Sequence, residues 1–95
     1  MYTIYVVFNC LEGKRGEFVE RVKNEGILAD VLAEDGCIRY DYYFSDKDSN
    51  ELLLIEAWES KAHQQAHIDT PHMARLRTFK DEYIVSTTLG EFEIK

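Results

Sequence analysis

Two histidines in the second half of the chain, His67 and His72, are the residues best suited to acid–base chemistry. A neutral imidazole can take a proton from a phenol or from a carbon next to a carbonyl, because it titrates near neutral pH. The intervening Thr70-Pro71 predicts a turn that returns the chain on itself and holds both rings near one mouth of a pocket. We expect one of them to be a general base; the alternative is a hydrogen-bonded histidine at a helix end. The sequence does not say which ring faces inward.

A third histidine, His63, lies four residues before His67, so both rings would share one face of a helix where a metal ion could bind. The neighbouring sequence supplies no Cys or Glu in a pattern that completes a ligand set. We therefore expect no metal site and interpret His63 as a surface residue.

Further polar and aromatic residues are candidates for substrate binding. Asn9 ends an apolar run, so its amide either orients a substrate oxygen or is satisfied by a turn. Glu56 and Trp58 are two residues apart in a predicted strand, so their side chains point to the same face of the sheet. The Glu56 carboxylate is therefore either a functional acid beside the Trp58 indole or the partner of a residue such as Arg39. The aromatic residues that would line a pocket, or else form plain core or dimer contacts, are Tyr40, Tyr42, Phe44 and Trp58.

The elements that must position these residues follow from the spacing of the apolar side chains. Strands are predicted over residues 2–10, 37–45, 51–58 and about 84–94, and helices over about 15–34, 61–69 and from Pro71 onward. Gly26 is expected to bend or split the first helix, and Ser60 and Thr70 are expected to cap the later ones. This order predicts an α+β domain of the ferredoxin-like split βαβ type, with helices on one sheet face.

The other sheet face is expected to meet a second copy of the chain. In residues 2–8 and 52–57 both alternating positions are largely apolar, whereas a sheet with one wet face alternates apolar and polar residues. Two helical stretches cannot cover both faces, and an exposed apolar patch of this size marks an interaction surface. The pattern therefore predicts a homodimer.

Composition limits the remaining choices. The 95 residues are enough for one domain, and 18 acidic against 11 basic residues give a net charge of -7, which disfavours nucleic acid and anionic membrane surfaces. No signal peptide, long apolar stretch or glycine-rich nucleotide motif is apparent, and two cysteines are too few for a disulfide framework. We expect a cytoplasmic protein.

Three stretches together resemble the antibiotic biosynthesis monooxygenase family: Gly36-Cys37-Ile38-Arg39-Tyr40, Glu56-Ala57-Trp58-Glu59-Ser60 and His67-Ile68-Asp69-Thr70-Pro71-His72. The resemblance covers nearly the whole chain and implies a single domain over residues 1–95 that pairs into a dimeric α+β barrel. It also implies a pocket between sheet and helices in each subunit. Members of this family include oxygenases that use no flavin, metal or haem.

The leading hypothesis is a cofactor-independent monooxygenase that oxidises a small quinol-like or phenolic substrate with dioxygen. His67 or His72 would be the base, and Asn9 or Trp58 would hold the ring and the oxygen. The alternatives are an isomerase of a small hydroxy-ketone signalling molecule, and a dimeric module that binds a small molecule without chemistry.

Overall fold

The chain folds into strands and helices in the predicted order. The computed structural model describes residues 1–92, and all statements below concern these residues. The strands are β1 (Tyr2–Cys10), β2 (Cys37–Phe44), β3 (Glu51–Trp58) and β4 (Ile84–Glu91). The helices are α1 (Arg15–Asn24), α2 (Ile27–Leu32), α3 (Lys61–Ile68) and α4 (Pro71–Phe79), and a short 3-10 turn, Lys80–Glu82, follows α4. The end of the predicted last strand, at Ile94, lies outside the described residues.

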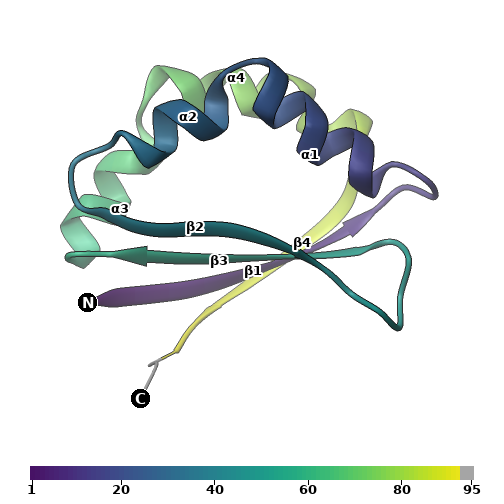
Figure 1. Cartoon of the computed structure of the whole chain (residues 1–95), viewed down its shortest axis with the longest axis horizontal. Coiled ribbons are helices and arrows are strands. Elements are labelled where there is room, and N and C mark those ends of the chain that lie inside the picture. Colours follow the sequence, from purple (N-terminus) through teal and green to yellow (C-terminus); the bar gives the residue numbers. More distant parts are fainter. Residues whose placement is uncertain (93–95) are drawn as a thin grey trace.

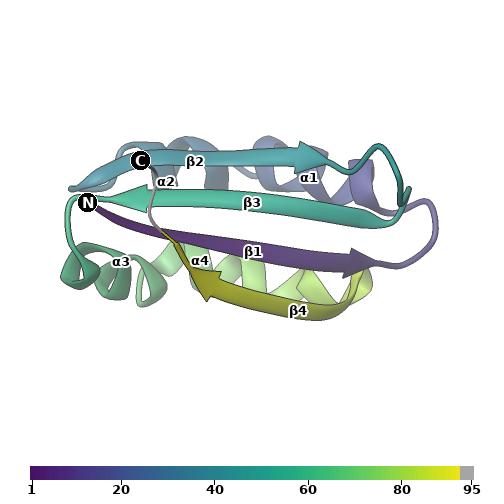
Figure 2. The same cartoon turned by 90° about the horizontal axis from the view of Figure 1, so that it is seen from below.

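The strands form one antiparallel sheet in the order β2-β3-β1-β4. Figure 1 shows α1 to α4 together on one side of this sheet, and Figure 2, seen from below, shows the other side with no helix in front of it. The architecture is the predicted ferredoxin-like α+β fold. No helix within residues 1–92 is long and apolar enough to cross a membrane.

The helix boundaries have local causes that can be read in the sequence. Gly26 adopts a φ of 77°, a left-handed conformation that suits glycine, and it separates α1 from α2 as predicted. The Ser60 hydroxyl caps α3 by accepting from the His63 backbone N–H. The Thr70 hydroxyl caps α4 in the same way, with Pro71 in the first helical position. These caps fix the turn between α3 and α4.

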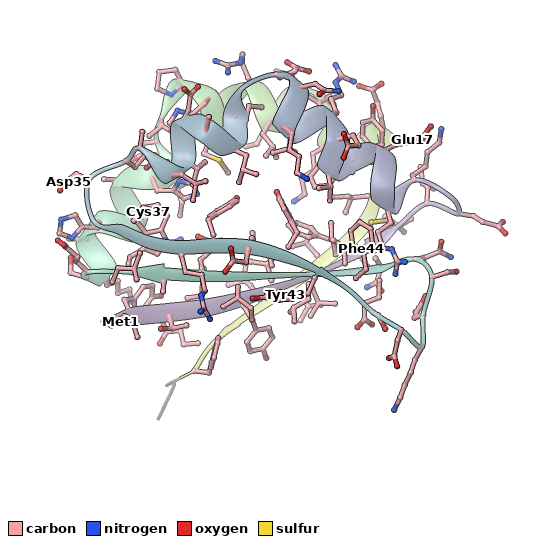
Figure 3. The ribbon with its side chains drawn as sticks, in the orientation of Figure 1. Met1, Glu17, Asp35, Cys37, Tyr43 and Phe44 are labelled. Carbon is pink, nitrogen blue, oxygen red and sulfur yellow. The ribbon has the colours of Figure 1, made fainter. Side chains whose placement is uncertain are left out.

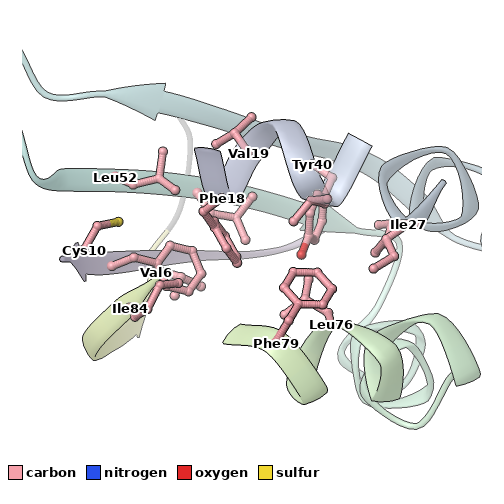
Figure 4. Close-up of a cluster of buried hydrophobic side chains, with 14 of the residues drawn as sticks. Val6, Cys10, Phe18, Val19, Ile27, Tyr40, Leu52, Leu76, Phe79 and Ile84 are labelled. Carbon is pink, nitrogen blue, oxygen red and sulfur yellow. The ribbon is translucent and has the colours of Figure 1, made fainter. Parts of the chain in front are cut away.

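The core lies between the helices and the sheet. Along β1, alternate residues from Ile4 to Cys10 point toward the helices and are buried. They belong to one cluster with Phe18 of α1, Tyr40 of β2 and Phe79 of α4, and Figure 4 shows Val6 and Cys10 within it. Phe18 alone has four aromatic neighbours, Phe8, Tyr42, Phe79 and Tyr83, at ring-centroid distances of 5.8 to 6.4 Å. This packing holds helices and sheet in fixed relation.

The sheet face without helices is also apolar. It carries Tyr5, Val7, Leu53 and Ile55, all half-buried, with Val7 opposite Leu53 and Tyr5 opposite Ile55 in the register of β1 and β3. Tyr43 of the neighbouring β2, labelled in Figure 3, is 45% exposed. A face of this composition fits the predicted contact with a second copy, which stays a prediction.

Candidate functional site

A pocket of about 360 Å³ lies between the sheet and the helices. Most of its lining is apolar, with side chains from β1, β3, α1 and α4. Its polar lining residues include Glu56, Gln64, His67, Arg77, Lys80 and Glu91. The pocket therefore combines an apolar cavity with a few convergent polar groups, as small-molecule sites do. The apolar residues of its body include Ile4, Val6, Phe8, Phe18, Leu54, Met73 and Leu76.

His67 is the one histidine among the residues that line this pocket. It occupies the last turn of α3, and its side chain is 2% exposed. Its Nδ1 lies 2.7 Å from Oε2 of Glu34, a residue in the turn between α2 and β2. A carboxylate can only accept a hydrogen bond, so Nδ1 of His67 carries the proton and donates the hydrogen bond to Glu34. The Nε2 of a neutral His67 is therefore unprotonated and free to act as a base.

His72, in the first turn of α4, shares the same carboxylate. Its Nε2 lies 2.8 Å from Oε2 of Glu34, so one oxygen accepts hydrogen bonds from two imidazoles. The turn at Thr70-Pro71 thus brings both histidines together, as the sequence indicated. Of the two, His67 lines the pocket and His72 does not.

The environment of His67 favours its neutral form. Burial lowers the pKa of the ring, and the hydrogen bond to Glu34 opposes that shift only in part. The Trp58 ring packs against the imidazole at a centroid distance of 4.7 Å, and Tyr40 lies edge-on at 5.6 Å. The ring is therefore held in one orientation.

Glu56 of β3 is a further titratable group of the pocket. Its Oε1 lies 3.9 Å from Nε2 of His67 and accepts a hydrogen bond of 3.1 Å from the indole N–H of Trp58. Burial raises the pKa of the Glu56 carboxyl to about 7, against the lowering effect of the Trp58 hydrogen bond. A carboxyl with this pKa can donate or accept a proton near neutral pH. Arg39, one possible partner of Glu56 considered from the sequence, pairs instead with Asp41 at 3.1 Å.

Only some of the other predicted substrate-binding residues line the pocket. Tyr40 and Tyr42 line the pocket, and burial raises the pKa of both phenols, so both stay protonated. Trp58 is fully buried behind Glu56 and His67 and acts on the pocket through them. The remaining two residues, Asn9 and Phe44, lie elsewhere.

Asn9 and Phe44 do not line this pocket, and their predicted part in substrate binding stays a prediction. Asn9 is exposed on the sheet face without helices, and its amide donates to the Ser86 hydroxyl on β4. Side chains alternate along β1, so Asn9 points to the sheet face opposite to Ile4, Val6 and Phe8, which line the pocket. Phe44, at the far end of β2, is 52% exposed under the guanidinium of Arg15.

Sequence reasoning missed Glu34. This residue precedes the predicted turn Asp35-Gly36, and it lies 33 positions before His67 along the chain. The available signal was an acidic residue at a helix end before a glycine turn, which is common on protein surfaces. His63 belongs to a separate exposed group, with Nε2 3.5 Å from Asp35 and 3.8 Å from Glu59.

The family of the chain can be stated from its sequence. The model of the family described as antibiotic biosynthesis monooxygenase matches residues 1–78. The chain belongs to the antibiotic biosynthesis monooxygenase family. Both histidines, Glu34 and Glu56 fall within the matched residues.

Relatives of this monooxygenase family are similar over part or all of the chain. YgiN of Escherichia coli K12, a probable quinol monooxygenase, is 38% identical over 55 residues, which cover 50% of this chain and 53% of that protein. The chain thus spans about half the length of the curated relatives it matches.

Solved structures match along the whole chain. A conserved protein from Bacteroides thetaiotaomicron, described as a possible oxidoreductase, has a TM-score of 0.82 at 27% identity and covers 98% of this chain and 96% of its own. The protein PA3566 from Pseudomonas aeruginosa has a TM-score of 0.84 at 20% identity, over 99% and 93% of the two chains. At that identity the second match shows the fold alone.

Proposed function

We propose that the protein is a cofactor-independent monooxygenase that oxidises a small quinol-like or phenolic substrate with dioxygen. The observation that carries the proposal is the orientation of His67, with Nδ1 bonded to Glu34 and Nε2 3.9 Å from Glu56, which lines the same largely apolar pocket of about 360 Å³. A base of this kind can take the proton of a phenol bound in the pocket. Membership of the family and the similarity to a probable quinol monooxygenase support the same reaction class.

The proposed chemistry begins with a proton transfer. Nε2 of His67 takes the phenolic proton, and the resulting anion is electron-rich enough to reduce dioxygen directly. Glu34 stabilises the imidazolium that forms, because its carboxylate already accepts the hydrogen bond from Nδ1. His72 holds Glu34 in place through the second hydrogen bond to the same oxygen.

The remaining steps need a proton donor near the reduced oxygen. One oxygen atom enters the substrate ring, and the other leaves as water with two hydrogens from the quinol, so the substrate supplies all four electrons. Glu56 can give a proton to the departing oxygen, because its carboxyl is partly protonated near pH 7 and lies 3.9 Å from His67. Tyr40 and Tyr42 line the same pocket and would hold the substrate ring.

The test is oxygen consumption with a panel of quinols and phenols by the purified, chelator-treated protein. We expect uptake of one dioxygen per product formed and incorporation of one labelled oxygen atom from ¹⁸O₂. If no compound causes oxygen uptake while a hydroxy-ketone exchanges its protons with solvent, the isomerase hypothesis would replace this reaction.

The alternative is an isomerase of a small hydroxy-ketone. The proximity of His67 Nε2 to Glu56 favours it, since a base and a carboxyl can remove and return protons on neighbouring atoms. Solvent deuterium incorporation into a hydroxy-ketone, in the absence of oxygen, is the readout. Binding of a ligand without either reaction would leave the third hypothesis, a module that only binds a small molecule.

We also propose that the protein works as a homodimer in which two sheets meet through their apolar faces. The carrying observation is the uncovered row of Val7, Leu53 and Ile55 on β1 and β3. Leu53→Lys places a charge in this face, whereas Leu32→Lys makes the same change at an exposed leucine of α2. Sedimentation should give a monomer for the first variant and a dimer for the second. A parent protein that sediments as a monomer at micromolar concentration would remove the dimer proposal.

A further inference from the structure

The residues that orient His67 are also a set of metal ligands. Oε2 of Glu34, Nδ1 of His67 and Nε2 of His72 all lie within 4.8 Å of one another. Two imidazoles and one carboxylate form a common protein ligand set of zinc sites that keep a fourth position open for water. We propose that Glu34, His67 and His72 bind one Zn²⁺ ion, and that bound zinc inhibits the enzyme.

The present geometry is close to that of a zinc site. The two imidazole nitrogens lie 2.7 and 2.8 Å from the shared carboxylate oxygen. Ligand atoms of a tetrahedral zinc ion, with bonds of about 2.0 to 2.1 Å, are about 3.3 Å apart. Each nitrogen therefore needs to move by about half an ångström to admit the ion. The ligands come from three packed elements, the α2–β2 turn, α3 and α4, so the set is largely preformed.

Zinc binding would reverse the roles of the two nitrogens of His67. In the metal-free protein Nδ1 carries the proton and Nε2 has the free lone pair that faces the pocket. Zinc takes the lone pair of Nδ1, so the proton of the neutral ring moves to Nε2. The ring keeps the same number of protons, but Nε2 becomes a donor and can no longer take a proton from the substrate. This inhibitory effect rests on the proposed function, whereas the binding site does not.

A second histidine–carboxylate group in the described residues provides a matched control. Asp35, Glu59 and His63 also lie within ligand distance of one another, but their side chains are 95%, 64% and 30% exposed. Exposed carboxylates are hydrated, and the loss of that water weakens metal binding. We therefore expect zinc to prefer the buried group.

Calorimetric titration of Zn²⁺ into the chelator-treated protein tests the site. We expect one ion per chain, and a loss of affinity of at least about 10- to 100-fold in His72→Ala, because that variant lacks one ligand. His63→Ala should bind zinc as the parent does. Circular dichroism establishes that both variants are folded. No binding by the parent protein, or a loss in His63→Ala but not in His72→Ala, would overturn the site.

Two further measurements test the inhibition. Nitrogen NMR of the histidine rings should show the His67 proton on Nδ1 without zinc and on Nε2 with zinc. One equivalent of zinc should inhibit quinol oxidation by the parent and by His63→Ala, and a chelator should restore it. Full turnover by the zinc-loaded protein would overturn the inhibitory role. Calorimetry and NMR need no substrate, so a zinc site in a protein without oxygenase activity would overturn the proposed function alone.

Discussion

Two histidines one turn apart in α3 each lie between two carboxylates, yet only one of them is removed from water. His63 Nε2 is 3.5 Å from Asp35 and 3.8 Å from Glu59, and its side chain is 30% exposed. His67 is 2.7 Å from Glu34 and 3.9 Å from Glu56, and its side chain is 2% exposed. The two groups have nearly the same composition, so the comparison isolates the effect of burial.

The sheet and the α2–β2 turn create this difference. Glu34 and Asp35 are adjacent, but Glu34 points inward while Asp35, labelled in Figure 3, lies at the outer end of the molecule. Exposed ion pairs contribute little to stability because water and salt screen them. Burial instead shifts pKa values, and it lowers that of His67 and raises that of Glu56 to about 7. The buried group therefore holds a histidine that favours its neutral form beside a carboxyl that is partly protonated near pH 7.

The largest expected effect comes from replacing the two histidines. His67→Gln keeps the size and polarity of the side chain but removes the base, so turnover should fall by about 100- to 10,000-fold. His63→Gln makes the same change in the exposed group and should leave turnover within about twofold of the parent. Steady-state kinetics on a substrate that the parent converts gives the answer. Near-normal turnover of His67→Gln would contradict the assignment of the base.

The next effect is on stability and compares Glu56→Gln with Glu59→Gln. The folded pKa of Glu56, about 7, is above its ordinary value of 4.5, so its favourable contribution is fully present below pH 4.5 and is lost as pH rises through about 7. This loss amounts to at most about 3 kcal/mol between pH 4 and pH 8. Glu56→Gln should remove that part of the pH dependence, and Glu59→Gln should not. Urea unfolding at both pH values measures it, with His67 unchanged in every protein.

Glu34→Gln and Asp35→Asn test the orientation of the base. Loss of the Glu34 charge should lower turnover by about 10- to 100-fold, whereas Asp35→Asn should have little effect. The pH profile separates orientation from folding. In the parent, the rate should fall as pH drops through a value below about 6.5, because burial lowers the His67 pKa. In Glu34→Gln this limb should move to still lower pH, since the charge that raises the pKa is gone. An unchanged limb would contradict the direct contact.

The elements of this fold were largely predictable because each has a local cause. Strands Tyr2–Cys10 and Glu51–Trp58 match the predicted bounds, since β-branched and aromatic residues favour extended backbone. The split at Gly26 and the caps at Ser60 and Thr70 also depend only on near neighbours.

The candidate site was only partly predictable because its contacts are long-range. The contact of Glu34 with two histidines depends on the docking of the α2–β2 turn against α3 and α4, which no local pattern encodes. The position of Asn9 outside the pocket was predictable from strand alternation alone, since β1 directs Ile4, Val6 and Phe8 into the pocket.

The smallest expected effect concerns the two helix caps, Ser60 and Thr70. Ser60 contacts the partly exposed His63, and Thr70 contacts the buried His67. The Ser60 hydroxyl contacts Nδ1 of His63 at 2.7 Å, whereas the Thr70 hydroxyl donates to the His67 carbonyl at 2.8 Å. Each hydroxyl also caps its helix, so Ser60→Ala and Thr70→Ala should each lower the free energy of unfolding by about 1 kcal/mol.

Turnover should separate these two variants even though their stability losses match. Thr70 fixes the turn that places His67 and His72 on one carboxylate oxygen, so its loss loosens the base and should lower turnover several-fold. Ser60→Ala should retain parental turnover, because the histidine that it contacts is outside the pocket. Urea unfolding and steady-state kinetics on the same preparations provide both readouts. Equal turnover of the two variants would mean that the position of His67 is set by burial against Trp58 and Tyr40 and not by the turn.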